Sequence, residues 1–295
     1  MTPQGVPDLQ GVWTNAWLTR MERAKEFTTL TVPEAEAAKF DTENGGKFKV
    51  LKDPVGQEDS EWPEVGDQLA RIRGTARTSW VYDPADGKIP YTPAAQVANK
   101  ARMEANETVF DNPEQRPLGE RCLGITQVGP PLSNGPDLNN FQIVQTRDHV
   151  AIVGESNQSP RVIHLSGAHG PNAVRRWMGD SVGHWEGRTL VVETVNFHPA
   201  QARAPQGDSK ADTRVIERFT RVSPTEIHYA FSVENPVAYS QRWRGEMILR
   251  PSRGPMYEYA CHEGNYGFSN VLRGGRVVEP APPSAEPATG GAATQ

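Results

Sequence analysis

Between Asn139 and Cys261, apolar and polar residues alternate in short runs separated by turn residues. A period of two is typical of strands that bury one face. The pattern predicts strands at residues 141–145, 149–153, 161–165, 189–194, 213–221, 226–233, 246–250 and 257–261. The connectors at 146–148, 185–188 and 223–225 are short enough to join neighbouring antiparallel strands. We therefore expect a mainly β fold, either an antiparallel up-and-down barrel or a β-sandwich.

Residues 1–138 lack this alternation and are interrupted by turn chemistry such as Asp53-Pro54. Two segments, Val32–Phe40 and Thr92–Arg102, have a proline near the first turn followed by good helix formers, which predicts two short helices. We expect residues 1–138 to form an irregular, partly helical arm packed on a barrel of residues 139–279. Residues 280–295 are rich in Pro, Ala, Gly and Thr, which predicts a disordered tail.

Charge and composition narrow the classes of partner. The chain has 295 residues and a formal net charge of -5, which gives no basic field for nucleic acid or an anionic membrane. No run of eighteen apolar residues predicts a membrane span, and the first ten residues lack the pattern of a signal peptide. A methionine before a Pro/Gly-rich start also fits a replaced export signal. We expect a small molecule as ligand or substrate, with no nucleic acid partner and no membrane insertion.

The chain has two cysteines, Cys122 and Cys261, which is the number needed for one disulfide bond. Three interpretations remain open at this point. The two residues form a bridge in an oxidising compartment, they stay as buried thiols, or Cys261 is a reactive thiolate beside His262.

Two resemblances bear on fold and location. Gly11-Val12-Trp13 is similar to the Gly-x-Trp opening of lipocalin barrels, which implies a lipocalin-like barrel with the indole closing one end. Longer segments resemble a family of uncharacterised, exported bacterial proteins, which implies a periplasmic or secreted location and a shared site but no reaction. Those segments are Arg116–Cys122, Trp177–Ser181, Trp185–Thr194 and the Tyr-Ala-Cys-His-Glu-Gly-Asn-Tyr-Gly run at 259–267.

The segment Cys261–Gly267 concentrates polar and aromatic groups directly after a predicted strand. His262 is the first candidate for acid/base catalysis, because an imidazole titrates close to neutral pH. Glu263 supplies a second titratable group, while Asn265 and Tyr266 are candidate substrate contacts. The alternative is that His262 and Asn265 hydrogen-bond a buried turn.

Asp180 and Arg121 complete the predicted catalytic group. Asp180 follows a glycine and could orient His262, or it could cap a turn. A bridge between the two cysteines would bring Arg121 beside His262, where it could polarise a substrate or pair with Glu263.

Aromatic residues supply further candidates for substrate contact, at the mouth of a cavity: Trp80, Tyr82 and Tyr239. The other six histidines, including His149 and His164, show no paired spacing, so we expect neither a metal nor another cofactor. The first hypothesis is a cofactor-independent lyase, isomerase or hydrolase acting on a small aromatic or sugar-derived molecule. The alternative is a non-catalytic, lipocalin-like periplasmic binding protein for an apolar or aromatic ligand.

Overall fold

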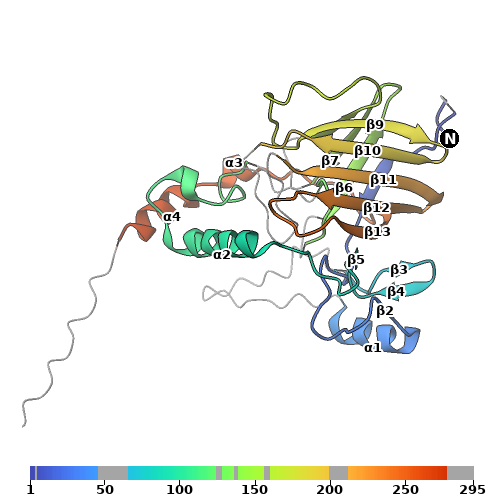
Figure 1. Cartoon of the computed structure of the whole chain (residues 1–295), viewed down its shortest axis with the longest axis horizontal. Helices are drawn as coiled ribbons and strands as arrows, with labels where there is room; N and C mark the ends of the chain where they lie inside the picture. Colours follow the sequence, from blue (N-terminus) through green and yellow to red (C-terminus); the bar gives the residue numbers. More distant parts are fainter. Residues whose placement is uncertain are drawn as a thin grey trace, which may run out of the picture.

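The computed structural model describes residues 1–3, 5–45, 66–123, 128–135, 139–155, 160–198 and 212–277. Its centre is a closed barrel of nine strands, which confirms the expectation of a mainly β fold and selects the barrel over the sandwich (Figure 1). The strands in order around the ring are β1 (Gly11–Thr14), β6 (Asn140–Gln145), β7 (His149–Gly154), β8 (Arg161–His164), β9 (Asp180–Glu186), β10 (Thr189–Val195), β11 (Arg214–Ser223), β12 (Glu226–Glu234) and β13 (Trp243–Pro251).

The ring closes because β1 pairs with both β6 and β13. All its neighbours are antiparallel except β8 and β9, which run parallel. A parallel pair needs a long crossover connection, and residues 165–179 supply it. The barrel is thus mixed, and the prediction of a purely up-and-down, antiparallel order was wrong at this one step. This crossover brings a long loop to the barrel end at which β9 begins.

Alternating burial along the strands explains the core. In β12, the side chains of Ile227, Tyr229, Phe231 and Val233 are buried, and the residues between them are not. Large side chains from many elements fill the interior, among them Trp13, Trp80, Phe141, Phe219, Tyr229, Phe231 and Trp243. The indole of Trp13 is buried, donates to the carbonyl of Leu9, and lies under the guanidinium of Arg221.

A second layer lies against the barrel. It contains the three-stranded sheet of β2 (Thr31–Val32), β4 (Thr75–Arg77) and β3 (Arg71–Ile72), with α1 (Glu34–Asn44) beside it (Figure 1). A small separate core joins sheet and helix; it comprises Phe27, Val32, Ala37, Leu69 and Ala76. A further strand, β5 (Val81–Asp83), pairs with β13 at Arg244 and Gly245, on the part of that edge that β1 leaves uncovered.

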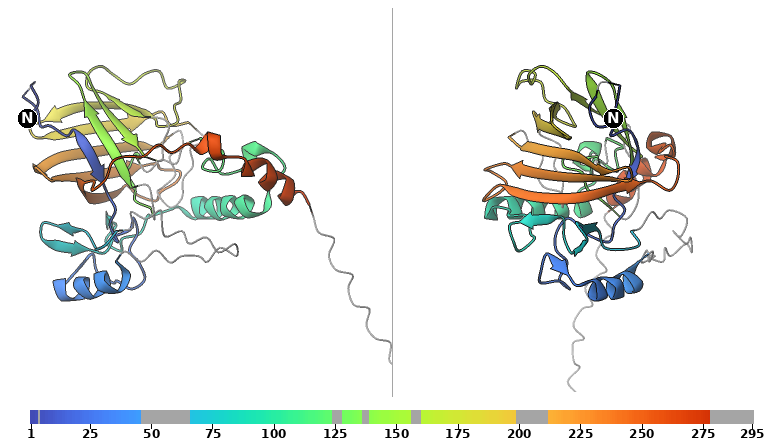
Figure 2. Two further views of the ribbon diagram at one scale, coloured as in Figure 1. Left: turned by 180° about the vertical axis from the view of Figure 1, so that it is seen from behind. Right: turned by 90° about the vertical axis from the view of Figure 1, so that its right-hand side faces the viewer.

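The remaining helices lie together to one side of the barrel, as the left view of Figure 2 shows. They are α2 (Pro93–Thr108), the 3-10 helix η2 (Pro113–Gln115), α3 (Cys261–Gly264) and α4 (Gly267–Gly275). Both predicted helices are confirmed as α1 and α2, and the hydroxyl of Thr92 caps α2 by accepting from the Ala95 N–H. Among the described residues, no helix is long and apolar enough to cross a membrane.

Seven of the eight predicted strands are confirmed within a few residues, but residues 257–261 form no strand and lead into α3 instead. The predicted boundary at residue 139 does not separate arm from barrel, because β1 completes the ring and α3 and α4 leave it. The predicted tail at 280–295 and the turn at Asp53-Pro54 lie outside the described residues.

Candidate active site

The segment that the sequence favoured as a site is exposed. His262 and Glu263 lie on the short helix α3 and both are exposed, and Tyr266 is 85% exposed. Within the part of the chain that the structure describes, neither the imidazole of His262 nor the carboxylate of Glu263 has a hydrogen bond or ion pair. The strand that was expected to lead into this segment is therefore replaced by a helix that presents both groups to solvent.

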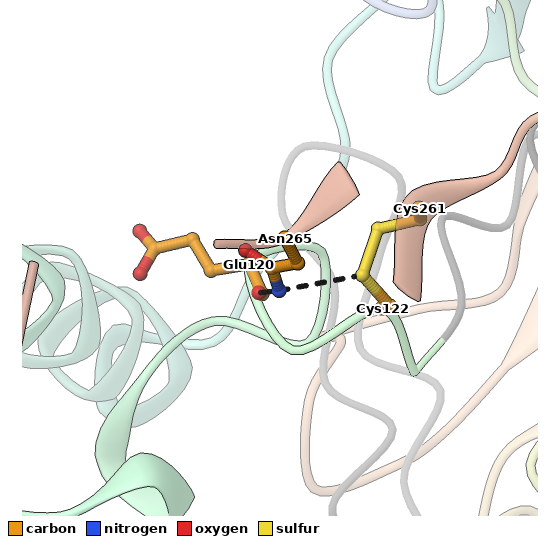
Figure 3. The surroundings of a disulfide bond; sticks show 4 residues. All are labelled: Glu120, Cys122, Cys261 and Asn265. Atoms are coloured by element: carbon orange, nitrogen blue, oxygen red, sulfur yellow. Dashed lines mark hydrogen bonds between the residues drawn. A yellow bond between two sulfur atoms is a disulfide. The ribbon is translucent and has the colours of Figure 1, made fainter. Parts of the chain in front are cut away.

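Asn265 and the two cysteines have a structural role in this region. Cys122 and Cys261 form a disulfide bond with their Cα atoms 5.8 Å apart. The Asn265 side-chain amide donates to the carbonyl of Glu120 at 2.8 Å and also contacts Sγ of Cys122 (Figure 3). Arg121 precedes Cys122 and His262 follows Cys261, so each of them is the sequence neighbour of one bridged cysteine. No hydrogen bond or ion pair joins their side chains among the described residues.

The three aromatic candidates lie in different surroundings. Trp80 is fully buried and donates through its indole to the side chain of Asn134, and Tyr239 is buried against the Trp243 ring. Both belong to the core rather than to a cavity mouth. Tyr82 is half-buried, and the pKa of its hydroxyl is raised, first by burial and then by the negative charge of Glu246.

Asp180 is buried beside a histidine, but that histidine is His169. Asp180 is the first residue of β9. Its side chain is 7% exposed and accepts a hydrogen bond from the backbone N–H of Gly170 at 2.7 Å. Its Oδ2 lies 3.4 Å from Nδ1 of His169, without the alignment of a hydrogen bond. Nη1 of Arg176 lies 3.5 Å from Oδ1, the other carboxylate oxygen of Asp180. Asp180, which the sequence suggested could orient His262, therefore lies beside a different histidine, in the crossover loop.

Backbone geometry positions this pair. Gly179 has φ +72, a left-handed conformation that an ordinary residue adopts only with strain. A Cβ there would lie 2.6 Å from Cγ2 of Thr194 and 2.9 Å from a ring carbon of Phe197. Asn196, with φ 59, is also left-handed, and its side chain donates to the carbonyl of Gly170. Glycine adopts this conformation without strain, whereas a non-glycine residue such as Asn196 does so less often, and such residues are concentrated at functional sites.

The closeness of Gly179 to its neighbours gives a stability prediction. We expect Gly179→Ala to lower the free energy of unfolding by about 2 to 4 kcal/mol, from the left-handed backbone plus the clash. Gly187→Ala is the matched control, because Gly187 also has a positive φ but has no atom within 4 Å of the added Cβ. Its cost should be only about 1 to 2 kcal/mol in urea unfolding curves. Equal losses in the two variants would show that the packing around Gly179 is not tight.

The second nitrogen of His169 faces Glu193. Nε2 lies 3.8 Å from Oε2 of Glu193 on β10, and the histidine side chain is 24% exposed. Arg214 on β11 neutralises Glu193 through a 2.5 Å contact, and this hydrogen bond is the first cause of the raised pKa of the Arg214 guanidinium. The imidazole therefore lies between two carboxylates, of which one is buried and the other reaches the surface.

An exposed aromatic surface lies next to these charged groups. Trp177 is 36% exposed, and its ring stacks on that of His198 with centroids 4.3 Å apart. Backbone hydrogen bonds tie the two segments together, because Arg176 donates to Asn196 and His198 donates to Arg176. An indole held in this way offers a face on which a planar or sugar ring could stack.

Beneath this cluster the barrel contains a fully buried ion pair. Arg161 on β8 and Glu217 on β11 are 1% and 0% exposed, and the guanidinium forms two hydrogen bonds with the carboxylate. Arg161 also donates to Thr194 and Ser181, and the Tyr229 hydroxyl donates to Glu217 at 2.8 Å. Buried charge is tolerated when it is paired and hydrogen-bonded in this way.

The segment 128–135 covers this ion pair from one end. The carbonyl of Val128 accepts from Arg161, and the N–H of Leu132 donates to the Tyr229 hydroxyl. Burial, followed by the charge of Glu217, raises the pKa of the Tyr229 hydroxyl well above 10, so this group stays protonated. The polar side chains that these bonds connect all have hydrogen-bond partners within the protein, which indicates a structural role for the network.

His169 was not predicted from the sequence as the partner of Asp180. Both residues flank glycines in the longest connector between predicted strands, and long connectors often have functional roles. That signal was available, but irregular backbone has no period from which the contact itself could be inferred. Glu217 was detectable, since it alternates with Val215 and Phe219 on the face of the strand that is otherwise apolar.

Within the described ranges, no group of three or more His, Cys, Asp or Glu side chains is arranged to hold a metal ion. No family model, curated protein or solved structure matches this chain.

Proposed function

We propose that this protein is a cofactor-independent acid/base enzyme, a lyase, isomerase or hydrolase, acting on a small aromatic or sugar-derived molecule. Its site is the end of the barrel at which β9 begins and β10 ends. The observation that supports this most is the buried Asp180 carboxylate 3.4 Å from Nδ1 of a partly exposed histidine, His169. This replaces His262 by His169 as the acid/base residue and keeps Asp180 as the orienting group.

Each group has a defined role in this proposal. Asp180 fixes the ring of His169 through Nδ1, so Nε2 is the nitrogen that exchanges a proton with the substrate. The 3.4 Å separation is long for a hydrogen bond, but such bonds often tighten only when substrate is bound. Arg176 supplies a positive charge for an anionic group of the substrate, and Trp177 supplies a ring for stacking.

The carrier hypothesis has less support. A barrel that carries an apolar ligand keeps its interior open, whereas Trp243, Phe231 and Tyr229 are at most 3% exposed here and fill that space. An exported location, in the periplasm or outside the cell, is part of the proposal. Its support is the Cys122–Cys261 disulfide, because such bonds persist mainly in oxidising compartments.

The experiment follows wild type, His169→Gln and Asp180→Asn with a panel of aromatic and sugar-derived compounds, using mass spectrometry for conversion and calorimetry for binding. We expect wild type to convert at least one compound. His169→Gln should bind it with similar affinity and convert it about a hundredfold to ten-thousandfold more slowly. Asp180→Asn should lower kcat more than it changes KM, because it removes orientation rather than contact.

Circular dichroism serves as the folding control for all three proteins. A compound that wild type converts and that His169→Gln converts at the same rate would remove His169 from the mechanism. Binding without conversion by every variant and by wild type would favour the carrier.

A further inference from the structure

Two histidines on neighbouring strands lie opposite each other on the outside of the barrel, with their rings edge to face at an interplanar angle of 67°. His149 begins β7 and His164 ends β8, and the two residues are directly paired in the antiparallel register. Their neighbours Val150 and Ile163 are buried, so strand alternation directs both imidazoles outward. The ring centroids are 5.0 Å apart, and His149 is exposed while His164 is half-buried.

We propose that His149 and His164 form a two-histidine site for a divalent transition-metal ion, separate from the proposed active site. A metal–imidazole bond of about 2.0–2.1 Å, with the ring centre about 1.1 Å behind the nitrogen, places two ligating rings about 4.5 to 5.2 Å apart. The observed 5.0 Å lies within this range. The strand pairing thus holds the two rings at a separation that suits chelation before any metal binds.

The donor set determines the metal. Imidazole ligands suit copper, zinc and nickel, and for a given nitrogen site Cu²⁺ binds more tightly than Ni²⁺ or Zn²⁺. No third His, Cys, Asp or Glu completes a cluster here among the described residues, so water fills the remaining positions. Cu²⁺ accepts a tetragonal arrangement with two nitrogen and several water ligands, which makes Cu²⁺ the favoured ion.

Surface exposure makes the site testable without unfolding the protein. Untagged wild type, His149→Ala and His164→Ala are titrated with Cu²⁺ by calorimetry, and the bound ion is observed by electron paramagnetic resonance. The control is His184→Ala, which removes an exposed histidine of the neighbouring strand β9; among the described residues its imidazole hydrogen-bonds Glu186 alone. Each of the three substitutions removes one imidazole, so only position distinguishes them.

Wild type should bind one Cu²⁺ ion tightly enough to show hyperfine splitting from two imidazole nitrogens. His149→Ala and His164→Ala should each weaken that binding at least about tenfold, while His184→Ala leaves it within about twofold. Unchanged affinity in either single variant, or a signal from one nitrogen in wild type, would overturn the proposal. Neither result bears on conversion by His169, so the two proposals stand or fall separately.

Discussion

Replacing Glu217 by glutamine is expected to lower the free energy of unfolding by about 3 to 5 kcal/mol. Glutamine keeps the volume of the side chain but removes its charge, so the guanidinium of Arg161 remains buried at 1% exposure without a counterion. One amide nitrogen would also face the Arg161 guanidinium or the Tyr229 hydroxyl, both of which donate to Glu217 in the native protein. Urea unfolding curves, followed by tryptophan fluorescence, measure the loss.

The matched control is Glu186→Gln. Glu186 also pairs with an arginine across strands, Arg218 on β11, but its side chain is 49% exposed. Water replaces the lost interaction there, so the free energy of unfolding should barely change. A small loss in Glu217→Gln, equal to that of the control, would show that the buried pair is not required for the barrel.

Removing the disulfide is expected to have an effect of similar size. The bridge spans a sequence separation of 139 residues, for which the chain-entropy model gives up to about 5 kcal/mol. Among the described residues, the hydrogen bonds from Asn265 to the Glu120 carbonyl and from Arg276 to the Asp111 carbonyl, which also join the C-terminal helices to the segment before the bridge, are exposed. We therefore also expect α3 and α4 to become sensitive to protease before the barrel does.

The test compares wild type with and without reductant and the double variant Cys122→Ser/Cys261→Ser. Adding reductant to the double variant controls for effects of the reagent that do not involve the bridge. Unfolding curves that coincide in all four samples would show that the bridge does not stabilise the folded chain. Cleavage of the barrel before residues 261–275 would contradict the proposed order of release.

Strand pattern predicted more of the fold than of the site. Alternation gave the strands from β6 to β13 except β9, because burial on one face leaves a period of two in the sequence. β9 was missed because its start, Asp180-Ser181, is polar, and its buried face holds Ser181 and Gly183 instead of large apolar residues. β1 was missed as a barrel strand because its partners, β6 and β13, are distant in sequence.

The sequence pointed to Asp180 as a candidate and offered the disulfide, which the structure contains, as one of three interpretations of the cysteines. It did not point to the histidine that we now propose. A dense polar motif, such as Cys261–Gly267, suggests a functional site in a sequence even when its side chains face solvent. His169 is isolated in sequence and becomes significant only through its contact with Asp180, which the crossover loop creates. Contacts made by irregular backbone depend on tertiary packing, and no local pattern encodes them.

The central claim is that acid/base chemistry takes place at His169 and not at His262. The most direct measurement is the rate at which wild type, His169→Gln and His262→Gln convert the same compound, at equal concentrations and with folding verified. We predict a loss of about a hundredfold or more for His169→Gln and a rate within about twofold of wild type for His262→Gln. The reverse order, with His262→Gln inactive and His169→Gln active, would contradict this account and return the site to α3.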